Sequence, residues 1–186
     1  MSADEVVTGS FEIHVFVAPL DPGPREAEAF RVACGTRMKA LLLHLDYQHR
    51  GFVGVLQSSR YVQGDVALAR AAAAEDAAQL KAAGFEVIRE KVEALATCDG
   101  VPRTAADARR SPPDRYFEFH LLFDREGGVT NEDVASLRGI AAALAARLER
   151  PVPLSYNALK PGQRFLNLRA RGVGLEAADR RGHALG

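Results

Sequence analysis

The sequence predicts an α+β protein made of two related halves. A seven-residue pattern occurs twice, first at 11–17 (FEIHVFV) and again at 117–123 (FEFHLLF). Each copy reads Phe-Glu-apolar-His followed by three apolar residues, and segments with helical and strand periodicity follow it. Successive side chains of a strand point to opposite faces. Each copy is therefore expected to be a strand with apolar residues on one face and the Glu and His on the other.

The composition is typical of a soluble globular protein. The 186 residues include 24 basic and 24 acidic side chains, and 47% of all residues are hydrophobic. This charge balance argues against broad nucleic-acid binding. No apolar run approaches the roughly 20 residues that cross a bilayer, so no membrane partner is expected. Cys34 and Cys98 form no paired motif, and a reducing cytoplasmic location is the simplest interpretation.

The first half is expected to contain six elements after a flexible N-terminus, residues 1–10. Pro24 suits the first position of a helix and Gly35 suits its end. Asp65 is a typical N-cap, and the Ala-rich segment after it favours a helix that stops at Gly84. The expected elements are a strand at 11–18, a helix at 24–34, a strand at 38–47, a strand at 52–57 closed by 58–61, a helix at about 65–83 and a strand at 85–95, with a turn near 48–51 between the second and third strands.

The second half repeats this order with shorter segments. Residues 97–115, rich in Gly, Pro and Arg, are expected to form a linker or surface loop. Thr130 and Asn131 mark the start of a helix that ends before Pro151. Its apolar stripe consists of Val134, Leu137, Ala141, Leu144 and Leu148. The remaining expected elements are strands at 116–124, 154–159 and 164–171, and a short helix at 175–184.

The predicted order is β-α-β-β-α-β followed by β-α-β-β-α. The first series is the order of a ferredoxin-like unit, and the second is the same unit without its last strand. The sequence thus predicts duplicated ferredoxin-like repeats at 11–96 and 116–186, packed as one compact body, with the second repeat truncated. The sheets are expected to be antiparallel, with helices on one face and polar residues on the other.

The polar faces contain the candidate functional residues. Glu12 and His14 are expected to lie near Gln57 and Ser59 in the first repeat, with Arg89, Lys91 and Glu93 on its last strand. In the second repeat, the matching set is Glu118, His120, Asn167, Arg169 and Arg171. Leu166, Leu168 and Ala170 alternate with the last three of these, as a half-buried strand requires.

One interpretation of this pattern is a site that binds or cleaves a phosphorylated small molecule or nucleotide in a cleft between the repeats. Histidine exchanges protons near neutral pH, so His14 and His120 are candidate acid and base catalysts. Positive charge for the phosphate oxygens would come from Arg60, Lys91, Arg169 and Arg171, and Ser59 would add a hydroxyl.

A central-strand histidine in each of two α/β lobes resembles the two-histidine phosphoesterase superfamily. That resemblance implies phosphoester cleavage by His14 and His120. The superfamily motif places Ser or Thr two residues after each histidine. Here those positions hold Phe16 and Leu122, so the motif hydroxyls are absent.

A second resemblance extends over most of the chain and is carried by residues 11–14, 85–94, 116–120, 154–158 and 164–174. In these stretches the chain resembles an uncharacterised bacterial protein family of no known activity. This resemblance implies that the chain is a single module.

Two alternatives use the same residues. If the two polar faces met, Glu12, His14, Glu118 and His120 would offer two nitrogen and two oxygen ligands to Zn²⁺, Mn²⁺ or Fe²⁺. In the plainer alternative these residues belong to solvated faces, where Glu118 with Arg169 or Arg171, and Glu12 with Lys91, form pairs between strands. The protein would then be a non-catalytic module for dimerisation or protein interaction, with a homodimer as one outcome.

Overall fold

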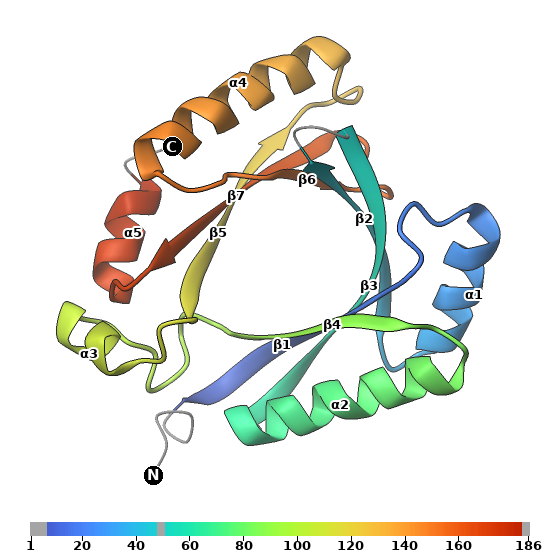
Figure 1. Ribbon diagram of the computed structural model, residues 1–186, viewed down its shortest axis with the longest axis horizontal. Coiled ribbons are helices and arrows are strands. Elements are labelled where there is room, and N and C mark those ends of the chain that lie inside the picture. The colour runs from blue at the N-terminus through green and yellow to red at the C-terminus, as the bar shows by residue number, and fades with distance from the viewer. Residues whose placement is uncertain (1–6, 48–50, 184–186) are drawn as a thin grey trace. The chain divides into compact units, whose positions relative to one another are not determined.

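The computed structural model describes residues 7–47 and 51–183. Within these ranges the protein has a mixed α+β fold with a seven-stranded antiparallel sheet and five helices (Figure 1). The strand order is β4-β1-β3-β2-β6-β7-β5. The elements are β1 (Thr8–Val17), α1 (Pro24–Cys34), β2 (Lys39–Tyr47), β3 (Gly51–Asp65), α2 (Val66–Ala82), β4 (Val87–Ala94), α3 (Ala105–Arg110), β5 (Tyr116–Asp124), α4 (Asn131–Leu148), β6 (Leu154–Asn157), β7 (Gln163–Arg171) and α5 (Leu175–His183).

The chain divides into two compact units, and the division is not a simple cut of the sequence. The first unit comprises the residues up to Leu43 together with Gly54–Val101, and the second comprises His44–Val53 together with the residues from Pro102 onward. The C-terminal end of β2 and the N-terminal end of β3 therefore belong to the second unit. The sequence analysis instead predicted that the whole of 11–96 forms the first repeat.

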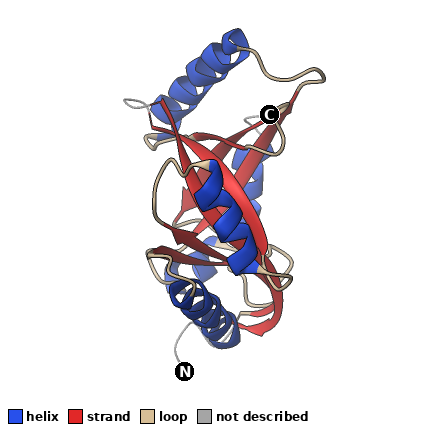
Figure 2. Cartoon of the chain, turned by 90° about the vertical axis from the view of Figure 1, so that its right-hand side faces the viewer, coloured by secondary structure: helices blue, strands red, loops and turns tan. Residues whose placement is uncertain are grey.

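The core of the first unit lies between its strands and the helices α1 and α2. Val15, Leu56, Phe30 and Leu80, one each from β1, β3, α1 and α2, are all at most 1% exposed. Figure 2, which turns α1 toward the viewer, shows this helix lying across the strands. The predicted alternation of β1 is confirmed, because Phe11, Ile13, Val15 and Val17 are buried on one face while Glu12 and Phe16, on the other face, are half-buried.

The helices of the first unit begin and end where the sequence predicted. Pro24 occupies the first turn of α1, and Gly35, just after the helix, adopts a positive φ of 59°, which favours glycine. Asp65 caps α2 by accepting a hydrogen bond of 2.8 Å from the backbone N–H of Leu68.

The extent of β3 differs from the prediction. The strand was expected to close at 58–61, but it continues to Asp65. The reason is that the whole of β1 pairs with it, from Thr8 opposite Asp65 to Val17 opposite Leu56. The predicted turn near 48–51 falls mostly on residues 48–50, which lie outside the described residues. Residues 1–6 of the predicted flexible N-terminus also lie outside them, whereas β1 already begins at Thr8.

The second unit has its own apolar core, between its strands and α4. Leu137 and Ala141 of α4 pack with Leu154 of β6 and with Leu166 and Leu168 of β7. The other predicted stripe residues of α4, Val134, Leu144 and Leu148, pack against the same cluster. The apolar stripe read from the sequence is therefore confirmed.

The segment predicted as a linker contains a short helix, α3. Thr104 caps it and accepts a hydrogen bond from the backbone N–H of Asp107, whose carboxylate in turn accepts one from the backbone N–H of Thr104. This reciprocal capping box is visible in the sequence as Thr-x-x-Asp, but the prediction did not use it. No helix among the described residues is long and apolar enough to cross a membrane.

Candidate functional site

The first unit presents a three-by-three array of side chains on the sheet face opposite its apolar core. We call this array the first polar face. In the central strand, β1, Glu12 lies opposite Tyr61 of β3 and Glu93 of β4, and the rows beside it follow the same register. Its members are Glu12, His14 and Phe16 of β1, Gln57, Ser59 and Tyr61 of β3, and Arg89, Lys91 and Glu93 of β4.

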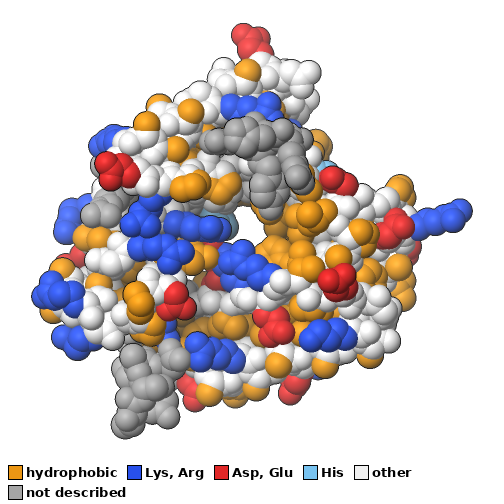
Figure 3. Space-filling model, in the orientation of Figure 1, with side chains coloured by type: hydrophobic (Ala, Val, Ile, Leu, Met, Phe, Trp, Pro, Cys, Tyr) orange, Lys and Arg blue, Asp and Glu red, His pale blue; other side chains and the backbone are white. Residues whose placement is uncertain are grey.

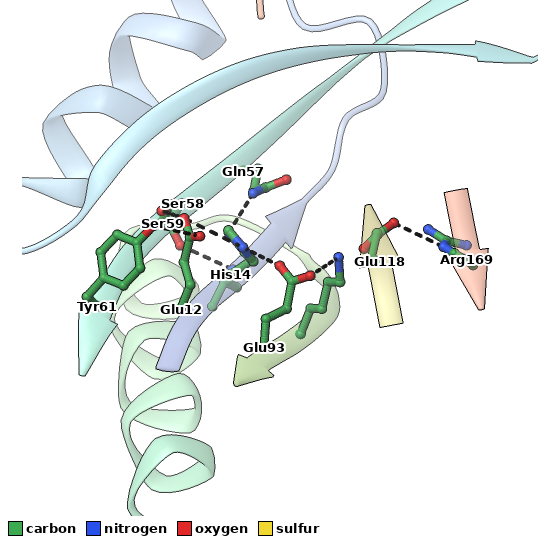
Figure 4. Close-up of polar contacts among 11 residues, drawn as sticks. Glu12, His14, Gln57, Ser58, Ser59, Tyr61, Glu93, Glu118 and Arg169 are labelled. Atoms are coloured by element: carbon green, nitrogen blue, oxygen red, sulfur yellow. Dashed lines mark hydrogen bonds and ion pairs between the residues drawn. The ribbon is translucent and has the colours of Figure 1, made fainter. Parts of the chain in front are cut away.

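His14 lies at the centre of the first polar face and both of its ring nitrogens have partners (Figure 4). Nδ1 lies 2.6 Å from Nε2 of Gln57, and Nε2 lies 2.8 Å from Oε2 of Glu93. The residue is only 7% exposed. One imidazole therefore bridges β3 and β4 across β1, and it is buried although it stands on a polar face.

Glu93 is the carboxylate most strongly perturbed by this arrangement. Burial alone would raise its pKa, but the hydrogen bond from His14 and the ammonium of Lys91, 2.7 Å from its other oxygen, lower the pKa to about 2. Glu93 is thus ionised throughout the neutral and weakly acidic range. The sequence predicted a pair of Lys91 with Glu12; in the structure Lys91 forms an ion pair with Glu93.

Glu12 is held by the hydroxyls of β3. Ser59 donates a hydrogen bond of 2.6 Å to Oε1 of Glu12, and Tyr61 donates one of 3.0 Å to Oε2. The hydrogen bond to Glu12 and the negative charge of that carboxylate raise the pKa of Tyr61. Oε1 of Glu12 is also 3.8 Å from Nε2 of His14, so two carboxylates approach the same ring nitrogen.

The placement predicted for Arg60 is corrected. Arg60 lies opposite Ile13 and therefore on the sheet face that packs against the helices, not beside His14. Its Nε donates a hydrogen bond of 2.7 Å to Asp76 of α2, a carboxylate that is 1% exposed and is also 3.1 Å from Nε of Arg37. Adjacent residues of one strand point to opposite faces, so Ser59 and Arg60 cannot serve the same site.

The second unit has a polar face of its own, on β5 and β7. We call it the second polar face; Figure 3 shows Lys and Arg side chains gathered over these two strands. Three residues of β5 on this face each lie opposite one residue of β7. The pairs are Tyr116 with Arg171, Glu118 with Arg169, and His120 with Asn167.

The two arginines of the second polar face differ in their partners. Arg169 donates a hydrogen bond of 3.0 Å from Nε to Oε1 of Glu118, which confirms the cross-strand pair expected from the sequence. Arg171 donates one of 2.7 Å to the backbone carbonyl of Asp114, which has no formal charge. Both guanidinium carbons lie near the ring of Tyr116, at 5.1 and 4.7 Å from its centre.

His120 and Asn167 complete the second polar face. His120 is exposed, and its ring centre lies 6.1 Å from that of Phe165. Asn167 is buried; its amide donates to the Ser155 hydroxyl at 2.9 Å and to the Pro153 carbonyl at 3.0 Å. The Asn167 side chain thus binds β6 and the segment before it, whereas the His120 side chain is exposed to solvent.

The metal alternative gains no geometric support. Among the described residues, no group of three or more His, Cys, Asp and Glu side chains is arranged to hold a metal ion. His14 belongs to the first unit and His120 to the second. A site that uses both histidines therefore stays a prediction.

The structure adds residues that the sequence did not single out as site residues. Glu93 and Gln57 bind the two nitrogens of His14, and Tyr116 contacts both arginines of the second polar face. Strand alternation placed Glu93 and Gln57 on the face of His14, as predicted, but only the pairing register and the side-chain contacts show that they reach the ring.

Comparisons of the chain with protein-family models, with curated proteins and with solved structures find no match. Both family resemblances read from the sequence therefore stay predictions.

Proposed function

We propose that the protein binds a phosphorylated small molecule or nucleotide and that the second polar face supplies the anion anchors. The observation that carries this proposal is the pair of guanidinium groups around Tyr116. Arg169 shares its charge with Glu118, whereas the partner of Arg171 is a backbone carbonyl, so the face has two guanidinium groups against one carboxylate. A phosphate can accept charge-assisted hydrogen bonds from such a pair.

The binding proposal is tested by calorimetric titration with inorganic phosphate and a panel of linear and cyclic phosphoesters. We expect Arg171→Gln to weaken binding about tenfold or more, since a hydrogen bond to a charged group contributes about 1.5–3 kcal/mol. Arg147→Gln is the matched control, because Arg147 is an exposed arginine at the end of α4 in the same unit. Equal affinities for the Arg171 variant and the control, or no binding of any panel member, would refute the proposal.

Hydrolysis of the bound phosphoester is the catalytic extension of this proposal. His120 is exposed and can meet a ligand directly, whereas His14 needs one of its two partners to release a ring nitrogen. Turnover of the same panel by the wild type, His14→Ala and His120→Ala separates binding from catalysis. Turnover that survives both substitutions would remove the histidines from the mechanism.

We further propose that the two units are ferredoxin-like repeats and that the protein works in the cytoplasm. In the first unit the first strand lies between the third and the fourth, in the order β4-β1-β3-β2. In the second unit β5 is likewise next to β7, which is next to β6. Both cysteines are free and buried, which is compatible with a reducing compartment.

A second candidate function is docking of a protein partner, including a second copy, on the second polar face. The observation that favours it is Leu122, which is 52% exposed on β5 two residues after His120, opposite the partly buried Phe165. Light scattering of the wild type and of Leu122→Glu tests this candidate. A monomeric wild type would exclude self-association on this face.

A further inference from the structure

A chain of hydrogen bonds runs across three strands of the first unit, from Glu93 through His14 to Gln57. The carboxylate of Glu93 is ionised and can only accept, so Nε2 of His14 must carry the hydrogen in their 2.8 Å contact. The amide nitrogen of Gln57 can only donate, so Nδ1 must be the acceptor in their 2.6 Å contact. The two neighbours thus require the same tautomer of the neutral ring.

We propose that Glu93 is the positioning residue of His14: it holds the neutral imidazole with its hydrogen on Nε2, so that Nδ1 is the nitrogen left to exchange a proton with a ligand. Gln57, which occupies Nδ1 in the free protein, is the residue that must move when the ligand arrives. The part of this inference that concerns the ligand rests on the proposed function. The tautomer is a property of the free protein and does not depend on it.

The surroundings of Glu93 suit this role. Its second oxygen is fixed by Lys91 at 2.7 Å, so the carboxylate cannot rotate away from the ring without losing an ion pair. Glu12 is the other carboxylate near Nε2, at 3.8 Å, but its two oxygens accept from Ser59 and Tyr61. A proton taken up at Nδ1 would give an imidazolium whose positive charge stays next to Glu93.

The tautomer can be read directly by nuclear magnetic resonance. Long-range ¹H–¹⁵N correlation spectra of the labelled full-length protein, at a pH where the imidazole is neutral, distinguish a protonated from an unprotonated ring nitrogen. His14→Gln identifies the signals by their loss. We expect the wild type to show Nε2 protonated and Nδ1 unprotonated, and the opposite assignment would overturn the proposal.

Glu93→Gln tests whether Glu93 sets this state. A carboxamide at position 93 can either accept from Nε2 or donate to it, so both tautomers become accessible and the two ¹⁵N resonances are expected to move toward each other. Glu90→Gln is the matched control, since Glu90 is an exposed carboxylate on the same strand. Circular dichroism verifies that each variant is folded. A folded Glu93 variant with the spectrum of the wild type would show that Glu93 does not position the ring.

The ligand part has a separate readout. When a phosphoester that binds by calorimetry is added to saturation, the Nδ1 resonance of His14 is expected to shift as Gln57 releases it. A saturated protein with an unchanged Nδ1 resonance would overturn the ligand part and leave the tautomer standing. Failure of every phosphoester to bind would refute the proposed function and, with it, the ligand part, while the tautomer result would remain valid.

Discussion

Asp76 shows what single residues contribute to the first unit. Its carboxylate is 1% exposed and is compensated by Arg60 of β3, whose Nε and Nη2 lie 2.7 and 3.1 Å from its two oxygens. Burial, and to a smaller extent the charge of Asp76, raise the pKa of the neighbouring thiol of Cys34 to about 11. Cys34 is therefore a thiol rather than a thiolate at neutral pH and behaves as a small core residue.

We expect Asp76→Ala to lower the free energy of unfolding by about 3–5 kcal/mol, because removing one partner leaves the largely buried Arg60 without its counter-charge. Chemical denaturation followed by circular dichroism measures this loss. Glu75→Ala is the control: Glu75 also binds Arg37, but its side chain is 65% exposed, and we expect a change within about 1 kcal/mol. Similar losses for the two variants would contradict a special role for the buried carboxylate.

The lowered pKa of Glu93 predicts how the free energy of unfolding depends on pH. Its pKa is lowered from 4.5 to about 2 on folding, so the unfolded state takes up a proton first as the pH falls. The stabilisation, at most about 3 kcal/mol, is complete above pH 4.5 and is lost between pH 4.5 and 2. We expect the difference in unfolding free energy between wild type and Glu93→Gln to shrink across this window. For Glu90→Gln the difference should change much less; a constant difference for Glu93→Gln would refute the assignment.

Strand alternation predicted the residue-scale pattern of the sheet faces and the pair of Glu118 with Arg169, but not the partners of His14. Glu12, His14, Ser59 and Lys91 do share one face, as the sequence indicated. The prediction for Arg60 was wrong, because Arg60 directly follows Ser59 in β3 and therefore points to the opposite face of the sheet. The binding of Glu93 to His14 depends on the register between β1 and β4, which no local pattern determines.

At the scale of elements, caps and close backbone contacts define where helices begin. Thr130 and Asp133 form a capping box at α4, and Thr104 and Asp107 form one at α3. Hydrogen bonds that the threonine backbone N–H and hydroxyl donate to these carboxylates lower the pKa of both aspartates. The sequence predicted the start of α4 but not α3, because a six-residue helix is too short to show a hydrophobic period.

Two glycines of the second unit are expected to respond in opposite ways to substitution by alanine. At Gly174, just before α5, an added Cβ would overlap the backbone of Arg103, so Gly174→Ala should destabilise the protein. At Gly139, inside α4, the same atom would meet nothing within 4 Å, and Gly139→Ala should stabilise it by up to about 1 kcal/mol. Thermal unfolding of both variants shows whether each substitution raises or lowers stability. A stabilised Gly174→Ala variant would contradict the close contact of Gly174 with Arg103.

On the scale of the whole molecule, the two units are joined through shared strands as well as through the 97–115 segment. β2 ends in the second unit and β3 begins there, because residues 44–53 belong to that unit. The sequence predicted the order of the elements, since strand and helix periodicities are local signals. It could not predict this exchange of strand ends, which depends on long-range contacts.

Shared strands should couple the unfolding of the two units. We expect Leu56→Ala, in the core of the first unit, to lower the free energy of unfolding by about 2–5 kcal/mol. The same substitution should speed amide hydrogen exchange in both units. Leu168→Ala, in the core of the second, should do the same. Exchange that rises only in the substituted unit would show that the units unfold independently.

Because residues 44–53 belong to the second unit, the chain cannot be divided at residue 102 into two complete units. A fragment that starts at Pro102 would contain β6 without β2, its neighbour in the sheet, and would expose the backbone N–H and C=O groups along that side of β6. Such an edge invites pairing with other chains and aggregation. A gene fragment that encodes only the residues from Pro102 onward is therefore expected to give a product that aggregates.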